Sequence, residues 1–281
     1  MKTTEEKVGK EFSGSRVDYF LREKMRISTA LIRKIKYTGV AVNGKIVTMR
    51  YTVNEGDTVS VTLPDMQSEN ILPIEMELDI VYEDEYVLAI NKPRDMPTHP
   101  SRGNHLPTLA QGVMAYMKPP FVFRAVNRLD RDTSGIVLIA KDAISAAKLS
   151  KQIADRQIEK KYIALVCGVP SQSHGIIDAP IERESEDTIK RVVREDGKRA
   201  ITEYEVIGIR DGIGALCEVT LHTGRTHQIR VHMAYIGHPL YSDFLYGKEV
   251  DGEVYRIHSK SISFNHPKTG ERITLTAECP F

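Results

Sequence analysis

The sequence contains no tryptophan and only three cysteines among its 281 residues. Cys167, Cys217 and Cys279 are far apart and odd in number, so they fit reduced cytoplasmic thiols better than a disulfide framework or a zinc site. No run of eighteen apolar residues occurs, which argues against a membrane span. The polar start of the chain, residues 1–14, does not resemble a secretory signal. These absences predict an ordinary globular protein of the cytoplasm.

The net charge is also close to zero, since the sequence has 39 Lys/Arg and 38 Asp/Glu. The charges are unevenly distributed, however. Residues 1–63 hold 12 Lys/Arg against 7 Asp/Glu, a net charge of +5, and the remaining residues carry −4. This asymmetry favours a basic N-terminal module on a slightly acidic body. Charge alone does not separate RNA binding from a chance imbalance.

Two short helices and a small sheet are predicted in the N-terminal module, residues 14–63. Ser15 and Ser28 are expected to be the N-caps, because serine side chains can accept hydrogen bonds from the free N–H groups of a first helical turn. Asn43-Gly44, between short apolar runs, is a strong hairpin signal. An alternating strand is predicted from Thr58 to Leu63.

This N-terminal pattern resembles the small RNA-binding domain named after ribosomal protein S-four. The matching segments are Arg16-Val17-Asp18, Gly39-Val40-Ala41-Val42-Asn43-Gly44 and Gly56-Asp57-Thr58-Val59. The resemblance implies that the basic helix contacts RNA phosphates through Arg33, Lys34 and Lys36, with Arg26 as a further candidate. The alternative is that these side chains are solvated surface cations.

Residues 64–73 lack periodicity and are predicted to be a linker, with a large domain over residues 74–281. Helices are expected at 143–158, capped by Asp142, and at 226–236. Many short apolar runs predict an α+β domain with a largely antiparallel mixed sheet flanked by helices and loops. These runs are 86–90, 136–140, 162–167, 201–207, 216–221 and 273–277.

The most informative segment is Asn127-Arg128-Leu129-Asp130-Arg131-Asp132-Thr133-Ser134-Gly135, called the signature loop below. It directly precedes the apolar run 136–140, so two carboxylates and two guanidiniums lie against the start of a core strand. Charge in such a position is costly unless it is paired or serves chemistry. The residues alone do not decide whether Asp130 or Asp132 serves the chemistry.

The signature loop resembles that of the pseudouridine synthases that modify large-subunit ribosomal RNA. Three further segments resemble the same family in the same order: residues 91–100, Lys160-Lys161-Tyr162, and residues 223–243. The resemblance implies an RNA isomerase that needs no cofactor and no metal. Its expected partner is large-subunit ribosomal RNA, with transfer RNA as the alternative and a monomer as the family expectation.

The resemblance also implies roles for individual residues. Asp130 is the catalytic aspartate, and it adds to the ribose or the base or abstracts a ribose proton; the sequence does not choose among these routes. A neighbouring cation would favour the ionised carboxylate. By analogy this cation is Arg225, with Arg230 as the alternative; Arg230 is also expected to contact RNA. Tyr162 would stack on the target uracil, and Arg128 would fill the space of the flipped nucleotide.

Three residues depart from the family pattern. Asn127 stands where histidine is usual, and it is expected to preserve loop support through hydrogen bonds. Asp95 and Ser242 stand where glycine is common, and Asp95 suggests a locally different backbone. These departures bear on the substrate more than on activity.

Two other functions compete with the isomerase. One is a non-catalytic RNA-binding or ribosome-assembly protein, against which the joint presence of Asp130, Tyr162 and Arg225 argues. The other is a glycoside hydrolase with Asp130 and Asp132 as its paired carboxylates, which leaves the basic module unexplained. His99, His227 and His232 lack cysteines at ligand spacing, so a zinc site is not expected.

Overall fold

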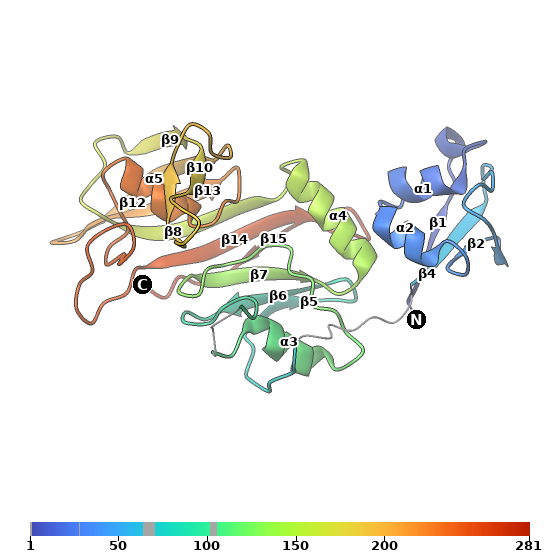
Figure 1. Ribbon diagram of the computed structural model, residues 1–281, viewed down its shortest axis with the longest axis horizontal. Helices are drawn as coiled ribbons and strands as arrows, with labels where there is room; N and C mark the ends of the chain where they lie inside the picture. Colours follow the sequence, from blue (N-terminus) through green and yellow to red (C-terminus); the bar gives the residue numbers. More distant parts are fainter. Residues whose placement is uncertain (1, 28, 64–70, 102–105) are drawn as a thin grey trace.

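The computed structural model describes residues 2–27, 29–63, 71–101 and 106–281. An N-terminal module and a larger domain follow one another along an elongated molecule (Figure 1). The module is an antiparallel sheet with strand order β1-β4-β2-β3. Its elements are β1 (Lys2–Lys7), η1 (Lys10–Phe12), α1 (Val17–Glu23), α2 (Thr29–Ile35), β2 (Val40–Val42), β3 (Lys45–Ile46) and β4 (Thr58–Leu63). The sheet therefore includes a strand that precedes residue 14.

The module folds around the apolar faces that the sequence pattern predicts. Val17, Phe20 and Leu21 of α1 are fully buried. Asn43 and Gly44 both have positive φ, 50° and 78°, which is the conformation of a type I′ hairpin turn. The prediction that Ser15 caps α1 is wrong, because Arg16 is the N-cap and the Ser15 hydroxyl donates to the Phe12 carbonyl instead. The predicted cap Ser28 lies outside the described residues.

The larger domain is built on one mixed sheet of nine strands. Its order is β5-β6-β7-β14-β8-β13-β12-β9, with β15 also paired to β14. Only β7 and β14 pair in parallel; the other described pairs are antiparallel. The strands are β5 (Ile80–Glu83), β6 (Val87–Lys92), β7 (Ser134–Ala140), β8 (Glu159–Cys167), β9 (His174–Asp178), β12 (Ile201–Arg210), β13 (Gly214–Leu221), β14 (Ile257–Asn265) and β15 (Arg272–Thr276). A separate hairpin pairs β10 (Ile181–Arg183) with β11 (Arg191–Val193). The fold is α+β, as predicted.

Helices cover both faces of the sheet. Alternate residues of β6 and β7 belong to different core clusters, because successive strand side chains point to opposite faces. Leu88, Ile90, Val137 and Ile139 share a cluster with α3 (Leu109–Met117) and α5 (Gln228–Tyr235). Val87, Ala89, Ile136 and Leu138 share one with Leu149 of α4 (Ala143–Ala154). In Figure 1, α3 and α4 accordingly lie on either side of β6 and β7.

Two predicted helices are shorter in the structure than in the sequence pattern. The cap Asp142 is confirmed, since its carboxylate accepts from the backbone N–H groups of Ile144 and Ser145. The helix ends at Ala154 rather than 158, and Arg156 then takes a φ of +58°. Helix α5 begins at Gln228 rather than 226, because His227 has a left-handed φ of +58°. Both ends are therefore set by single residues with positive φ.

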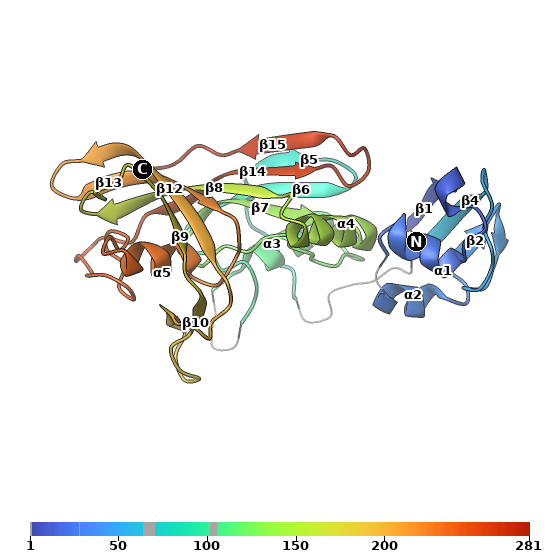
Figure 2. The same cartoon turned by 90° about the horizontal axis from the view of Figure 1, so that it is seen from above.

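The N-terminal module packs against α4. Ile144, at the start of α4, belongs to the buried cluster of the module, and Ala143 packs against that cluster. Both views place α1 and α2 beside α4 (Figures 1 and 2). Within the described ranges, no helix is long and apolar enough to cross a membrane.

Candidate active site

The signature loop enters the sheet where its two parallel strands begin to pair. Ser134 and Gly135 of β7 lie opposite His258 and Ser259 of β14. Gly135 has a φ of +109°, and a Cβ atom there would lie 2.3 Å from the Ser259 carbonyl oxygen. Only glycine permits this approach. The strand pairing thus fixes the end of the loop at the centre of the sheet.

Side-chain hydrogen bonds hold the rest of the loop. The Thr98 hydroxyl donates to the Leu129 carbonyl (2.8 Å) and accepts from the Leu129 N–H (3.2 Å). The Asn127 amide donates to the Ile136 carbonyl (3.0 Å) and accepts from the Leu138 N–H (2.8 Å). Asn127 therefore supports the loop, as expected for a residue that replaces histidine.

Lys92 ties the signature loop to the segment after β6. Its ammonium group is fully buried and donates to the carbonyls of Pro93 (2.7 Å), Met96 (2.7 Å) and Arg131 (3.0 Å). Burial lowers the pKa of Lys92 to about 7, although the negative charges of Asp132, Asp130 and Asp95 act to raise it. A cation with all three donors on main-chain oxygens thus lies behind the loop.

The two residues that replace glycine keep a glycine-like backbone, so the expectation of a different backbone at Asp95 is wrong. Asp95 and Ser242 have φ values of +58° and +59°. The Ser242 hydroxyl stabilises this conformation through contacts with the carbonyls of Val250 and Glu253 and the N–H of Val250. Aspartate and serine therefore adopt the left-handed region that these positions require.

Asp130 lies at the wall of a cleft of about 910 Å³. Its side chain is 34% exposed, so it can meet a ligand in this cleft. The cleft is formed mainly by residues 97–101, 125–131, 153–160 and 221–230, together with Tyr162 and Ile257. The neighbouring Asp132 is instead engaged by both Nε and Nη2 of Arg131, at 2.8 and 3.1 Å. The two carboxylates of the loop thus have different surroundings.

Tyr162 of β8 lies within the same cleft. It is 5% exposed, and its hydroxyl hydrogen-bonds with Ser259. Burial raises the pKa of Tyr162 to about 12; the Ser259 contact opposes this and the charge of Asp130 adds to it. The hydroxyl therefore keeps its proton at neutral pH and senses the charge of Asp130.

Arg225 and Arg230 both line the cleft but have different partners. Arg225 lies in the loop before α5, and its Nε donates to the Arg199 carbonyl (3.1 Å). Arg230 is 3% exposed and binds Asp243 through two hydrogen bonds, of 2.7 and 2.8 Å. Burial alone would lower the pKa of Arg230, but the Asp243 hydrogen bonds and the charges of Tyr255, Asp243 and Asp130 raise it.

Three aromatic rings surround the Arg230 guanidinium. Phe244, Tyr246 and Tyr255 lie 5.5, 4.9 and 4.3 Å from its central carbon. Such rings favour a planar cation over their faces. None of the three rings was predicted to belong to the site, although they follow the family-like segment 223–243.

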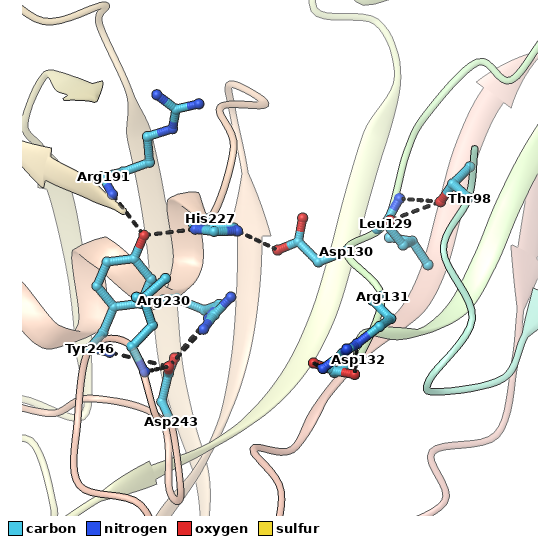
Figure 3. A network of polar contacts seen from close by, with 11 residues as sticks. Thr98, Leu129, Asp130, Arg131, Asp132, Arg191, His227, Arg230, Asp243 and Tyr246 are labelled. Carbon is cyan, nitrogen blue, oxygen red and sulfur yellow. Dashed lines mark hydrogen bonds and ion pairs between the residues drawn. The ribbon is translucent and has the colours of Figure 1, made fainter. Parts of the chain in front are cut away.

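His227 lies across the cleft from Asp130, and its side chain points toward the Asp130 carboxylate. Its Nε2 lies 3.9 Å from the Asp130 Oδ2, and its Nδ1 lies 2.7 Å from the Tyr246 hydroxyl (Figure 3). Burial lowers the pKa of His227; Asp130 and Asp243 raise it, and Arg230 and Arg191 lower it further. His227 was not among the site residues predicted from the sequence.

The predicted RNA contacts lie at the surface except Arg230, which is buried against Asp243 and is not placed to meet RNA from solvent. Arg128 is exposed at the edge of the cleft. Arg33, Lys34 and Lys36 are exposed on and just after α2, in the other module. The structure thus brings Asp130, Tyr162, Arg225, Arg230 and Arg128 to one cleft and leaves the three cations of α2 outside it. In the described part of the chain, no cluster of three or more His, Cys, Asp or Glu could hold a metal ion.

Comparison with known proteins agrees with this architecture. Residues 86–235 match the RNA pseudouridylate synthase family. The uncharacterized RNA pseudouridine synthase YlyB of Bacillus subtilis is 39% identical over 96% of this chain and 92% of its own length. The ribosomal large subunit pseudouridine synthase D of Zymomonas mobilis is 33% identical over 100% and 95%. The structure of human RNA pseudouridylate synthase domain containing 1 superposes with a TM-score of 0.62 at 26% identity, over 73% of this chain and 84% of that one.

The matched range contains the signature loop, Tyr162 and the segment that carries both arginines. The chain therefore belongs to the RNA pseudouridylate synthase family. It is an RNA pseudouridine synthase and thus an isomerase.

Proposed function

We propose that this chain converts uridines of large-subunit ribosomal RNA to pseudouridine, with Asp130 as the catalytic residue. The observation that carries the proposal is the surroundings of Asp130, a partly exposed carboxylate in a cleft that also holds Tyr162 and Arg230. Two relatives over 30% identical bear the name ribosomal large subunit pseudouridine synthase D, which supports the choice of RNA.

The reaction needs one carboxylate and an enclosed site. The bond between uracil N1 and ribose C1′ breaks, the base rotates, and a bond forms between C5 and C1′, while C5 loses its proton and N1 gains one. No electrons are gained or lost overall. Asp130 acts by adding to the ribose or the base or by taking a ribose proton, and each route requires the ionised carboxylate beside the glycosidic bond.

Arg230, rather than Arg225, best fits the cation that acts on Asp130. Arg230 is buried, is held by Asp243 and lies within electrostatic reach of Asp130. A buried guanidinium acts strongly because little water screens it. Arg225, whose Nε is engaged by a main-chain carbonyl, fits a contact with the RNA at the cleft wall.

Tyr162 and Arg128 have roles on either side of the target base. Tyr162 presents a ring to the cleft and keeps its hydroxyl proton, so it can stack on uracil and donate a hydrogen bond. The target uridine must leave its stack to reach Asp130. Arg128 is exposed beside the cleft, and its planar guanidinium can occupy the vacated position.

The N-terminal module is proposed to bind RNA in the manner of the S-four domain. Its motif matches are those of the sequence, and its two helices lie on a small antiparallel sheet. Arg33, Lys34 and Lys36 extend from α2 into solvent, where phosphates can reach them.

The test is an assay with purified protein on separate transcripts of large-subunit ribosomal RNA and transfer RNA. Pseudouridine is mapped by chemical labelling and primer extension. We expect modification of discrete uridines in the ribosomal transcript by the wild-type protein and none by Asp130→Asn. Modification of transfer RNA alone would contradict the substrate, and undiminished activity of Asp130→Asn would contradict the catalytic assignment.

A further inference from the structure

A chain of hydrogen bonds fixes which nitrogen of His227 carries the ring proton. The backbone N–H of Arg191 donates to the Tyr246 hydroxyl oxygen (2.9 Å), and this oxygen lies 2.7 Å from His227 Nδ1. Burial raises the pKa of Tyr246 to about 12, so its hydroxyl proton is retained. Because the oxygen already accepts from Arg191, its own proton is available to Nδ1. Nδ1 is then an acceptor, and a neutral ring carries its proton on Nε2.

The protonated nitrogen faces the catalytic carboxylate. Nε2 is the ring atom 3.9 Å from the Asp130 Oδ2 (Figure 3). Burial keeps the ring neutral at physiological pH by lowering the pKa of His227, since the charges of Arg230 and Arg191 offset those of Asp130 and Asp243. The structure therefore presents a neutral N–H donor to Asp130 rather than a second cation.

The ring is also held in place before any RNA arrives. His227 has φ +58° and ψ +18° at the N-cap of α5, a conformation that costs a non-glycine residue energy. The next side chain, Gln228, fixes this backbone by accepting from the Arg225 N–H and donating to the Ile201 carbonyl. The His227 ring then packs edge-on against Tyr246, with centroids 5.6 Å apart.

We propose that His227 is a positioning residue for Asp130 and that Tyr246 sets its tautomer. When RNA closes the cleft, Nε2–H donates to Oδ2 and orients the carboxylate toward the ribose. A gap of 3.9 Å is too long for a hydrogen bond in the free protein, but catalytic hydrogen bonds often tighten only in the substrate complex. This role rests on the proposed assignment of Asp130, whereas the tautomer is a property of the free protein.

The first test is the tautomer itself, read from nitrogen–proton correlation spectra of ¹⁵N-labelled protein without RNA. His227→Gln identifies the His227 signals by their loss. We expect an unprotonated Nδ1 and a protonated Nε2 at pH 7.5, and a shift of the tautomer balance in Tyr246→Phe. A proton on Nδ1, or on both nitrogens, would overturn the inference even if the enzyme is active as proposed.

The second test is a double-mutant cycle in single-turnover kinetics at saturating RNA, with the transcript that the wild type modifies. We expect Tyr246→Phe to lower the rate about tenfold and His227→Ala about a hundredfold, the scale of a hydrogen bond to a charged group. His227→Gln should regain part of this loss, since its amide can donate to Asp130.

Non-additivity separates positioning from a merely structural role. If Tyr246 acts through His227, Tyr246→Phe has no further effect in the His227→Ala background. Tyr235→Phe, at an exposed tyrosine of the same helix, is the matched control and should leave the rate unchanged. Additive losses, or full activity of Tyr246→Phe, would contradict the proposed link.

Discussion

At the scale of single residues, two arginines five positions apart have different surroundings. Arg230 neutralises Asp243, which is fully buried, whereas Arg225 lies in the loop before the helix and has no carboxylate partner among the described residues. Arg230→Met should therefore lower the free energy of unfolding by about 3–5 kcal/mol, because it leaves a buried charge unpaired. Arg225→Met should change it by less than about 0.5 kcal/mol. Urea denaturation of both variants measures this, and equal losses would contradict the assignment.

Lys160 offers a second prediction at this scale. It lines the cleft two residues before Tyr162, burial lowers its pKa, and it has no ion-pair partner among the described residues. Such a cation fits a phosphate of the bound RNA. Lys160→Met should raise the Kd for RNA and reduce the slope of log Kd against log salt by about 1.

The adjacent residue supplies the control for Lys160. Lys161 is bound to Glu218 on the neighbouring strand, and it is not among the residues of the cleft. Lys161→Met should leave the salt slope unchanged. If both variants change the slope equally, Lys160 has no special contact and acts only through net charge.

At the scale of elements, the exposed cations on and just after α2 carry the expected RNA contact of the N-terminal module. Replacing Arg33, Lys34 and Lys36 by glutamine should weaken RNA binding and reduce the salt slope by up to about 3 units. Affinity is measured by filter binding over a range of salt. Replacing Lys10, Lys45 and Arg50, which are exposed elsewhere in the module, removes the same charge. Equal losses in the two triple variants would contradict a local contact.

Much of this element structure follows from the sequence because the patterns are local. The Asn43-Gly44 hairpin, the buried run 136–140 and the cap Asp142 each depend on neighbouring residues. Helix α3 was not predicted, although its N-cap Thr108 and Gln111 form a capping box. The predicted start of α5 at residue 226 was wrong, because nothing in the sequence indicates that His227 has a left-handed φ. Strand order was also beyond reach, since pairing across the sheet is nonlocal.

The site was predictable to a similar degree. The family motifs named Asp130, Tyr162, Arg225 and Arg230, and the structure brings all four to one cleft. Choosing between the two arginines required the burial of Arg230 and its Asp243 partner, which sequence spacing does not reveal. Tyr246 lies sixteen residues beyond Arg230, so its contact with His227 depends on how the chain turns back after α5.

At the scale of the whole molecule, Lys92 links global stability to pH. Its pKa in the folded protein, about 7, is below the ordinary value of 10.5, so the unfolded chain binds more protons between these pH values. The contribution of Lys92 to the free energy of unfolding should therefore rise with pH from about 7 towards 10.5, by up to about 1.4 kcal/mol per pH unit. Lys92→Met should flatten this rise.

Chemical denaturation at several pH values measures this effect as a difference in slope. The comparison of slopes is needed because Lys92→Met also leaves three buried carbonyls without their donor, which lowers stability at every pH. Lys248→Met, at an exposed lysine, should reproduce the wild-type slope. Parallel curves for Lys92→Met and the wild type would show that Lys92 does not titrate in this range.

The measurement that tests the central claim most directly is pseudouridine mapping of total RNA from cells that lack this protein. The cells are complemented with the wild type, with Asp130→Asn, or with Asp132→Asn, whose carboxylate is engaged by Arg131. We expect sites in large-subunit ribosomal RNA to disappear in the deletion and to return with the wild type but not with Asp130→Asn. Restoration by Asp130→Asn, at matched protein levels, would contradict the account.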